Sequence, residues 1–336
     1  MVAMTSMACE QTFELRGKRI WIAGHTGLVG SALHRRLSQE PCELLLAGHD
    51  ELDLIRQDAT EAWMRRMQPQ VVVVAAARVG GIMANSRYPA DFLYGNLMIA
   101  ANVLRTAHEI GVERLVWLGS SCIYPREAEQ PIQEESLLTG PLEATNEAYA
   151  IAKIAGLKLA ESYSRQHGQQ FFTVMPCNLY GPNDNFDPQN SHVIPALMRR
   201  MHEAKEAGAR TVELWGTGTP LREFLHVDDL ADAVVLLLRR HVSCQPVNVG
   251  SSLEISIADL AHAVARVVGY RGRIVFDPTK PDGTPRKVLG SQRVKSLGWR
   301  PSISLEDGLG EMYRAWRARK AAAQAPSDRA VEQVVG

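Results

Sequence analysis

The chain has 336 residues, of which 46% are hydrophobic, and its 37 Lys and Arg residues equal its 37 Asp and Glu residues. This length can bury one large or two modest cores, and the balanced charge gives no field that would draw the protein to nucleic acid or an anionic membrane. No segment is long and apolar enough to cross a membrane, and residues 1–17 do not resemble a signal peptide. We therefore expect a cytoplasmic protein that binds neither nucleic acid nor membrane.

The five cysteines are odd in number and lack the spacing of metal ligands. They are Cys9, Cys42, Cys122, Cys177 and Cys244. Scattered cysteines in a protein without a secretion signal are normally reduced. We expect free thiols, without disulfides and without a bound metal.

Strand and helix patterns alternate along the first half of the chain. The predicted strands are 18–23, 43–47, 71–75, 115–118 and 171–175, and the predicted helices are 28–39, 61–67, 97–109 and 149–167. This alternation is typical of a parallel sheet covered by helices on both faces. We therefore predict an α/β fold with a Rossmann-type, doubly wound parallel sheet.

The second half of the chain predicts a smaller C-terminal α/β lobe that binds substrate. A loop rich in Asn, Pro and Gly, 176–190, is expected to reach over a ligand. Shorter elements follow it, at 193–206, 212–214, 228–240 and 257–268. The predicted organisation is an N-terminal extension (1–17), a mainly dinucleotide-binding domain (18–175), a mainly substrate-binding lobe whose chain returns to the first domain (176–317) and a disordered tail (318–336).

Three glycines recur every third residue where the first predicted strand becomes the first predicted helix. Glycine at Gly24, Gly27 and Gly30 permits a tight turn and close approach of the backbone to a pyrophosphate at the helix N-terminus. The whole loop is Gly24, His25, Thr26, Gly27, Leu28, Val29 and Gly30. Its place in the first strand-helix unit predicts a dinucleotide site.

The segment after the second predicted strand leaves the choice between NAD(H) and NADP(H) open. An acid at the strand end favours NAD(H), whereas nearby arginines favour the 2′-phosphate of NADP(H). Asp50 comes a few residues after the strand, and His49 offers only partial positive charge. His49 is equally consistent with a phosphate contact and with a surface loop.

A tyrosine and a lysine four residues apart predict a proton-transfer site. Tyr149 and Lys153 share one helix face, where an ammonium can lower the pKa of a phenol. Ser120 follows another apolar strand, at the sheet edge where open sheets bind ligands, and its hydroxyl can donate to a substrate carbonyl. Together with the glycine loop, these residues indicate a nicotinamide enzyme that acts on a carbonyl.

Several other residues are candidates that also have ordinary structural interpretations. Cys122 would face the same side of the chain as Ser120, although a buried cysteine is more often an inert hydrophobe. His192 precedes a predicted helix and could be a cap or a solvent-exposed residue. The remaining candidates, each better explained on its own by a lobe core or a solvated loop, are Asn178, Trp215, Arg222, Asp282 and Arg286.

At these residues the chain resembles the extended short-chain dehydrogenase/reductase superfamily, and within it the epimerase-reductases of GDP-4-keto-6-deoxy-D-mannose. The resemblance runs from about Lys18 to Arg317. Its most specific stretches are 80–85, 119–125, 146–156, 175–185, 191–200, 222–229 and 280–287. Their spread over the chain makes a chance likeness improbable.

The resemblance implies roles for particular residues. Ser120, Tyr149 and Lys153 would form the proton-transfer group, and Cys122 and His192 the acid/base pair that epimerises C3 and C5 before the C4 ketone is reduced. The implied dinucleotide contacts are the glycine loop, His49, Asp50, Glu51, Leu52, Asp53, Leu54, Leu118, Gly119, Ser120, Ser121, Lys153, Pro176, Cys177, Asn178, Leu179 and His192. The implied GDP-sugar contacts are Arg200, Trp215, Arg222 and Asp282.

The chain also departs from the family pattern. Thr26 and His49 stand where family members have arginines, so NADP(H) is the cofactor that the resemblance implies and NAD(H) the alternative. Cys177 replaces a more usual Thr, and Ala148 a Pro.

The resemblance further implies a homodimer packed through 97–109 and 149–167. A colitose synthase-like epimerase-reductase would keep the same acid/base set and differ in its sugar contacts. A dinucleotide-sensing regulator is a different class of function, but such proteins usually lose the Tyr or the Lys that this chain retains.

Overall fold

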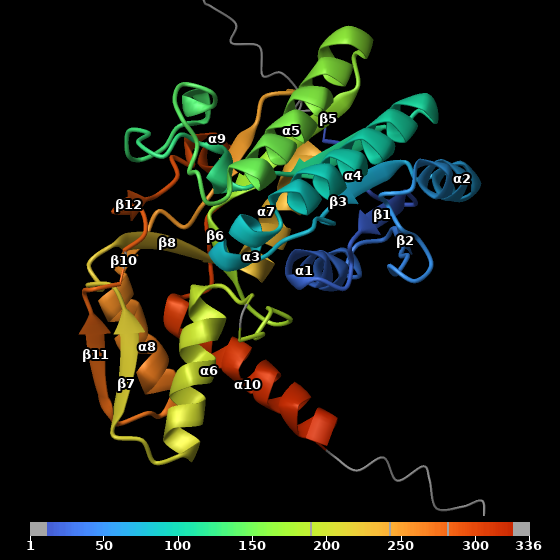
Figure 1. The fold of residues 1–336 in the computed structure, drawn as a ribbon. Coiled ribbons are helices and arrows are strands. Elements are labelled where there is room, and N and C mark those ends of the chain that lie inside the picture. The colour runs from blue at the N-terminus through green and yellow to red at the C-terminus, as the bar shows by residue number, and fades with distance from the viewer. Residues whose placement is uncertain (1–11, 189, 242, 281, 325–336) are drawn as a thin grey trace, which may run out of the picture.

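The structure is a computed structural model that describes residues 12–188, 190–241, 243–280 and 282–324. A large α/β layer forms the upper part of the view in Figure 1, and a smaller lobe lies below it. None of the helices in these ranges is both long and apolar enough to span a membrane.

Six parallel strands form the central sheet. They are β1 (Arg19–Ala23), β2 (Glu43–Leu45), β3 (Val71–Val74), β4 (Arg114–Leu118), β5 (Gln170–Pro176) and β9 (Val247–Val249), in the order β2-β1-β3-β4-β5-β9. The central strands β3 and β4 are buried along their whole length, as expected for a sheet covered on both faces. The predicted doubly wound Rossmann-type fold is confirmed.

Two helix layers cover this sheet. In one, α1 (Leu28–Leu37) packs against α7 (Val227–Arg240). In the other, α4 (Pro89–Glu109) lies between α2 (Gln57–Met67) and α5 (Glu147–His167), and Figure 1 shows α4 and α5 side by side. The prediction that 228–240 belongs to the smaller lobe is wrong, because α7 buries its apolar face in the main core and leads into β9.

The smaller lobe has its own hydrophobic core. Its elements are α6 (Val193–Glu206), β7 (Thr211–Trp215), α8 (Ile257–Val268), β11 (Arg273–Asp277) and α10 (Leu305–Gln324). Another small sheet is formed by β6 (Asn178–Tyr180), β8 (Leu221–His226), β10 (Glu254–Ser256) and β12 (Arg286–Lys287). The remaining helices are α3 (Ile82–Arg87), α9 (Gln292–Ser296) and the 3₁₀ helices η1 (Ser121–Ile123) and η2 (Glu134–Ser136).

The chain is helical beyond the predicted start of the tail. Helix α10 continues to Gln324, so the prediction of disorder is wrong for 318–324, while 325–336 lie outside the described residues. Trp316 stacks on Phe186 with ring centroids 4.7 Å apart. Arg319 donates to the side chain of Asn183. These contacts and the Ala-rich sequence favour a continued helix.

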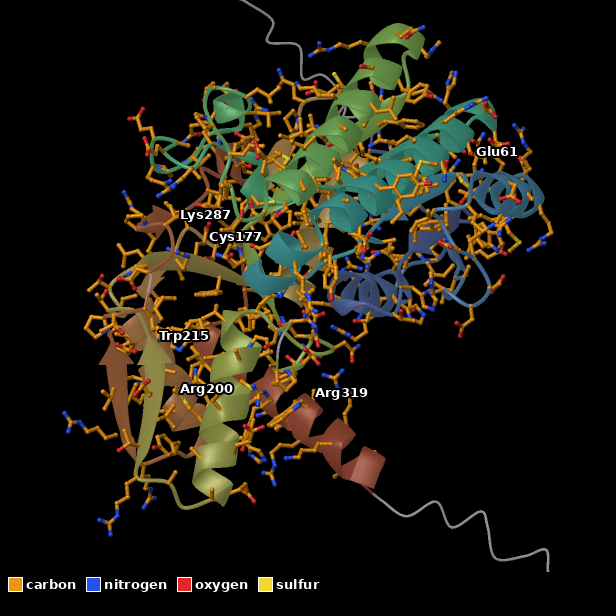
Figure 2. The ribbon with its side chains drawn as sticks, in the orientation of Figure 1. Glu61, Cys177, Arg200, Trp215, Lys287 and Arg319 are labelled. Atoms are coloured by element: carbon orange, nitrogen blue, oxygen red, sulfur yellow. The ribbon has the colours of Figure 1, made fainter. Side chains whose placement is uncertain are left out.

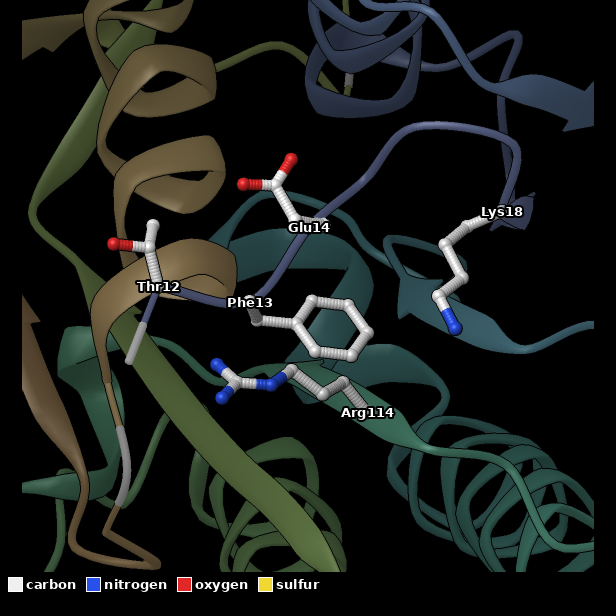
Figure 3. Close-up of a pocket in the computed structure, with 5 residues that line it drawn as sticks. All are labelled: Thr12, Phe13, Glu14, Lys18 and Arg114. Carbon is white, nitrogen blue, oxygen red and sulfur yellow. The ribbon is translucent and has the colours of Figure 1, made fainter. Parts of the chain in front are cut away.

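Part of the predicted N-terminal extension belongs to the main core. Leu15 is buried, and the Phe13 ring lies 4.5 Å from the guanidinium of Arg114 (Figure 3). Arg114 begins β4, so the pocket that it lines with Phe13 lies at the amino edge of the sheet. This is the edge opposite the strand ends at which Rossmann folds bind ligands.

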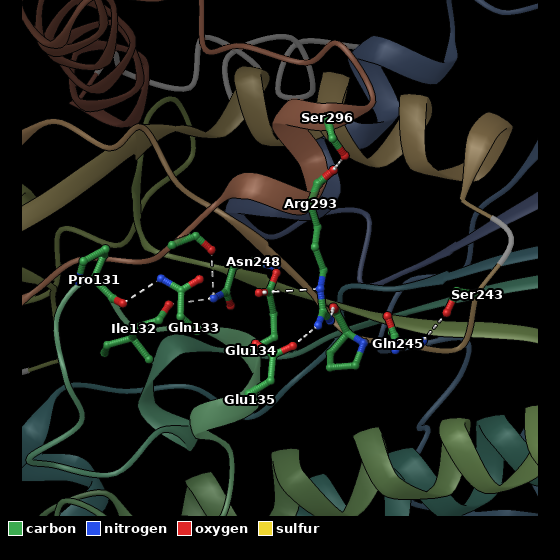
Figure 4. A network of polar contacts seen from close by, with 12 residues as sticks. Pro131, Ile132, Gln133, Glu134, Glu135, Ser243, Gln245, Asn248, Arg293 and Ser296 are labelled. Carbon is green, nitrogen blue, oxygen red and sulfur yellow. Dashed lines mark hydrogen bonds and ion pairs between the residues drawn. The ribbon is translucent and has the colours of Figure 1, made fainter.

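A buried amide joins three segments of the main domain. Asn248, in β9, accepts a hydrogen bond from the Tyr124 hydroxyl at 2.6 Å and donates to the carbonyls of Ile132 and Gly290. Its backbone N–H donates to Glu134, as part of the network in Figure 4. Tyr124 follows the candidate residues Ser120 and Cys122, so this network holds their loop against the sheet.

We predict that Tyr124→Phe lowers the free energy of unfolding by about 1–3 kcal/mol, because it leaves a buried amide oxygen without its donor. Urea unfolding measures the change. Tyr88→Phe is the matched control, since Tyr88 is 44% exposed. Equal stability of the two variants would contradict the prediction.

Candidate active site

The segments implicated by the sequence meet at the carboxyl edge of the central sheet. The glycine loop follows β1, 49–54 follow β2, Ser120 follows β4, and the Asn178 strand follows β5. Strands β1 and β2 are paired with Trp21 opposite Leu45, which places the loops that follow them side by side. Ligands of open α/β sheets bind at this edge.

The glycine loop has the shape of a pyrophosphate cradle. A Cβ at Gly30 would lie 2.0 Å from the carbonyl oxygen of Gly24, so only glycine permits this close approach. Gly24 also has a φ of 85°. Helix α1 begins after Gly27 with no side-chain cap and no acid in its first turn, which leaves N–H groups for an anion. The loop therefore fits a dinucleotide.

Tyr149 and Lys153 lie on the face of α5 that contacts the end of β4. The ammonium of Lys153 donates to the carbonyl of Leu118 at 2.8 Å and lies 4.5 Å from the Trp117 ring. A Cβ at Gly156 would meet that indole at 2.5 Å, so glycine permits the close packing of α5 on β4. The side chain of Lys153 is thereby held at the site.

Burial changes the pKa values of both groups. It lowers the pKa of the Lys153 ammonium to about 8. It raises the pKa of Tyr149, an effect to which the nearby Cys122 thiolate charge adds. The prediction that the Lys153 ammonium lowers the pKa of the Tyr149 phenol is therefore wrong. At neutral pH Tyr149 is a protonated phenol, which is the form needed to donate a proton.

Cys122 is buried within the turn that follows Ser120. Burial raises the pKa of its thiol, while the charge of Lys287, the Ser120 hydroxyl and the charge of Lys153 act in the opposite direction. The Ser120 hydroxyl also accepts a hydrogen bond from the Cys122 N–H at 3.4 Å. The two lysine charges therefore favour the thiolate, and substrate binding or proton transfer to a neighbour must offset the remaining effect of burial before Cys122 acts as a base.

His192 lies beside a buried carboxylate. Its side chain is 53% exposed and its Nδ1 is 3.9 Å from Asp184 Oδ1. This carboxylate raises the pKa of His192, and burial acts in the opposite direction. A Cβ added at Gly81 would lie 3.5 Å from the carbonyl oxygen of Ser191, so the Gly81 loop runs close to the residue before His192. His192 thus keeps its proton to higher pH than an ordinary histidine and suits the role of an acid.

The predicted GDP-sugar residues occupy the smaller lobe and the small sheet. Figure 2 shows Trp215 and Arg200 on the lower lobe and Lys287 above them. The Trp215 ring is 63% exposed, with Lys280 above it at 5.9 Å. Exposure of a large ring beside a cation suits stacking on a base.

Arg222 and Asp282 differ in their freedom to contact a ligand. Burial lowers the pKa of Arg222, and Asp282 acts in the opposite direction. The Asp282 carboxylate accepts hydrogen bonds from the Thr217 N–H and hydroxyl, at 2.9 and 2.7 Å. Asp282 therefore fixes the turn next to Trp215, whereas the Arg222 guanidinium has donors beyond its bond to the Leu221 carbonyl.

Asn178 and Cys177 connect the main sheet to the small sheet. The Asn178 amide donates to the Glu223 carbonyl at 2.9 Å. The Glu223 side chain is fully buried and accepts from the Ser252 and Leu289 N–H groups. Burial and the Glu223 charge raise the pKa of the Cys177 thiol, so this cysteine is a neutral part of the junction.

Two residues of this site were missed from the sequence. Lys287 belongs to a polar run far along the chain from Cys122, and only the pairing of β12 with β8 brings it near. Asp184 lies in the loop 176–190, where its acidic neighbour Asp187 has the same local sequence features. No short-range pattern distinguishes either residue.

A dinucleotide cradle beside a Ser, Tyr and Lys group defines a nicotinamide-dependent oxidoreductase of the Rossmann type. The model of the NAD dependent epimerase/dehydratase family matches residues 20–250, and the chain belongs to this family.

Named relatives cover nearly the whole chain. A GDP-L-fucose synthase of Sinorhizobium fredii is 55% identical over 302 residues, which are 90% of this chain and 96% of that protein. A GDP-L-colitose synthase of Yersinia pseudotuberculosis is 36% identical over 293 residues, 87% of this chain and 95% of that protein. A solved GDP-L-fucose synthetase of Naegleria fowleri bound to NADP is 27% identical, with a TM-score of 0.86 and coverage of 94% of this chain and 99% of that chain.

We predict that Asp184→Asn lowers the pKa of His192, because the substitution removes the carboxylate that raises it and leaves the opposing burial in place. An NMR titration of the histidine ring protons measures this shift. His262, exposed on α8, is the internal control. An unchanged His192 titration would contradict the assignment of Asp184.

We also predict that Lys287→Met raises the pKa of the Cys122 thiol, because it removes a nearby positive charge. Alkylation by iodoacetamide, followed against pH by mass spectrometry of the Cys122 peptide, reports the thiolate fraction. Lys287→Arg keeps the charge and should leave the profile near that of the wild type. Identical profiles for the Met and Arg variants would contradict the prediction.

Proposed function

We propose that the chain epimerises GDP-4-keto-6-deoxy-D-mannose at C3 and C5 and then reduces the C4 ketone with NAD(P)H to give GDP-L-fucose. The observation that carries the proposal is the arrangement at the end of β4, where Ser120 and Cys122 follow the strand and Lys153 of α5 donates to its Leu118 carbonyl. Ser120, Tyr149 and Lys153 would form the proton-transfer group, and Cys122 would act with His192, which lies beside Asp184, as the acid/base pair. The names of the relatives support GDP as the nucleotide.

The proposed epimerisation uses the acidity that the 4-ketone gives to the hydrogens on C3 and C5. Cys122 removes a proton, while the hydroxyls of Ser120 and Tyr149 donate to the enolate oxygen. His192 returns a proton to the opposite face of the sugar ring. Lys287 favours the thiolate form of Cys122, which makes the buried thiol a stronger candidate for the base.

The proposed reduction uses the same oxygen. The nicotinamide, when bound, supplies a hydride to C4. Tyr149 then gives its phenolic proton to the alkoxide, and Lys153, bonded to the Leu118 carbonyl, holds α5 so that Tyr149 stays beside this strand end. Because burial keeps Tyr149 protonated before the reaction, the residue is ready as the acid.

The smaller lobe is the proposed site of the nucleotide. Arg222 and Arg200 would pair with the diphosphate, and Trp215 would stack on the guanine. Asp282 would act through the turn that it holds beside Trp215. The resemblance and the NADP-bound Naegleria structure support NADP(H) as cofactor, with NAD(H) as the alternative.

We also propose a cytoplasmic homodimer that packs through α4 and α5. The two helices contact each other along the protein surface and carry exposed apolar side chains, Tyr94 at 60% and Ile151 at 43%. Burial of such side chains is a common source of dimer stability.

The second candidate is a colitose synthase-like reaction, which needs the same acid/base residues. The lower identity to the Yersinia protein, 36% against 55%, favours the fucose-forming reaction. Comparison of turnover with GDP-4-keto-6-deoxy-D-mannose and its 3-deoxy counterpart distinguishes the two. A regulator without catalysis would turn over neither.

Substitutions should separate the two halves of the reaction. We predict that Tyr149→Phe lowers the reduction rate by at least about a hundredfold, because proton transfer by a positioned acid contributes that much. Cys122→Ser should lower deuterium uptake at C3 and C5 from D₂O by a similar factor, because a serine hydroxyl is a far weaker base. Cofactor oxidation and NMR of the sugar measure the two activities.

Exposed Tyr88→Phe is the control for the tyrosine substitution. Reduction at the wild-type rate by Tyr149→Phe would contradict the role of Tyr149, and normal deuterium uptake by Cys122→Ser would contradict the role of Cys122.

A further inference from the structure

We infer that the chain binds NAD(H) more tightly than NADP(H), with Asp50 as the residue that selects the unphosphorylated ribose. The inference deepens the proposed function, and it rests on that function only in taking a nicotinamide dinucleotide as the cofactor. The resemblance favours NADP(H), and the residues around the ribose position of this chain favour the alternative, NAD(H).

The adenosine ribose of a Rossmann cofactor lies where the loops after the first two strands meet. In this chain those loops are 24–30 and 46–53, and the pairing of β1 with β2 places them next to each other. An acid in the second loop can accept hydrogen bonds from the ribose hydroxyls, whereas a 2′-phosphate needs a nearby Arg or Lys. The charges in these two loops therefore decide the preference.

Neither loop contains a fixed positive charge. No Lys or Arg occurs in 24–34 or in 37–55. Arg35 and Arg36, in the last turn of α1, lie at the end of the helix away from the glycine loop and form ion pairs with Asp228 and Asp232 of α7. Their charges are directed toward α7, so a 2′-phosphate would gain little from them.

The second loop instead carries three carboxylates, and Asp50 is the one of the three whose side chain accepts no hydrogen bond from the described residues. Glu51 accepts from the Trp63 indole N–H at 3.1 Å, and Asp53 accepts from the Ile55 N–H at 3.0 Å. Asp50 is exposed, and its turn is closed by N–H groups that donate to the carbonyl of Gly48. A Cβ at Gly48 would meet no heavy atom within 4 Å, so there is open space beside this turn.

The charges of these residues oppose a 2′-phosphate. A phosphate monoester carries a charge of about −1.5 to −2 at neutral pH and is repelled by a cluster of acids. His49 is the one basic side chain in 46–53, and neither it nor a neighbour supplies the Arg or Lys that holds a 2′-phosphate in this position. Thr26, in the facing loop, contributes only a hydroxyl.

Equilibrium binding tests the inference without any sugar. The full chain is titrated with NADH and with NADPH at pH 8 and low ionic strength, and the fluorescence of the bound nicotinamide gives each Kd. We expect the Kd for NADPH to be at least about tenfold higher than that for NADH. An equal or lower Kd for NADPH would overturn the inference.

Two variants test the residues that carry it. Thr26→Arg should lower the Kd for NADPH about tenfold and leave that for NADH near the wild-type value. Asp50→Asn should weaken the binding of NADH and strengthen the binding of NADPH. This variant gives a result even if Thr26→Arg does not fold. Ser38→Arg, exposed at the far end of α1, controls for the added charge. An unchanged ratio of Kd values in Asp50→Asn would overturn the role of Asp50.

The inference and the proposed reaction can fail separately. Preferential binding of NADH without turnover of any GDP-4-keto sugar would contradict the reaction and support the inference. Production of GDP-L-fucose together with tighter binding of NADPH would support the reaction and contradict the inference.

Discussion

The hydrogen bond from the Lys153 ammonium to the Leu118 carbonyl sets the geometry on which the site depends. It joins α5 to the end of β4, where Ser120 and Cys122 follow, and so brings Tyr149 to the same loop. Removing a lysine charge from water is costly, and the carbonyl and the Trp117 ring offset part of this cost. Because the cost is only partly offset, the pKa of Lys153 is still lowered.

The charged groups around this bond do not titrate independently. The charges of Lys153 and Lys287 both lower the pKa of the Cys122 thiol. The charge of the Cys122 thiolate in turn raises the pKa of Tyr149. A proton lost by the thiol therefore favours retention of the phenolic proton. Under the proposed mechanism, this coupling would keep Tyr149 an acid while Cys122 acts as a base.

The central sheet and its glycine loop could be predicted from the sequence because their signals are local. Strands such as Val71–Val74 are short apolar runs, and glycine spacing marks the turn after β1. The small sheet could not be predicted, because β12 has two residues and exists only through pairing with β8. Lys287 was missed for the same reason.

Other differences also come from tertiary structure. Helix α7 follows β8 of the small sheet, yet the contact with α1 assigns it to the main domain. The sequence suggested that Lys153 would lower the pKa of Tyr149, but the ammonium is directed to Leu118 and burial determines the direction of the shift. Spacing along a helix predicts which side chains are neighbours, but it does not predict the environment that surrounds them.

If one site performs both epimerisation and reduction on one GDP-sugar, the positions of isotopes in the product will show it. The purified chain is incubated in D₂O with GDP-4-keto-6-deoxy-D-mannose and unlabelled reduced dinucleotide, and the product is analysed by NMR. We expect GDP-L-fucose with deuterium at C3 and C5 and hydrogen at C4. A product without deuterium at C3 and C5, reduced only at C4, would contradict it.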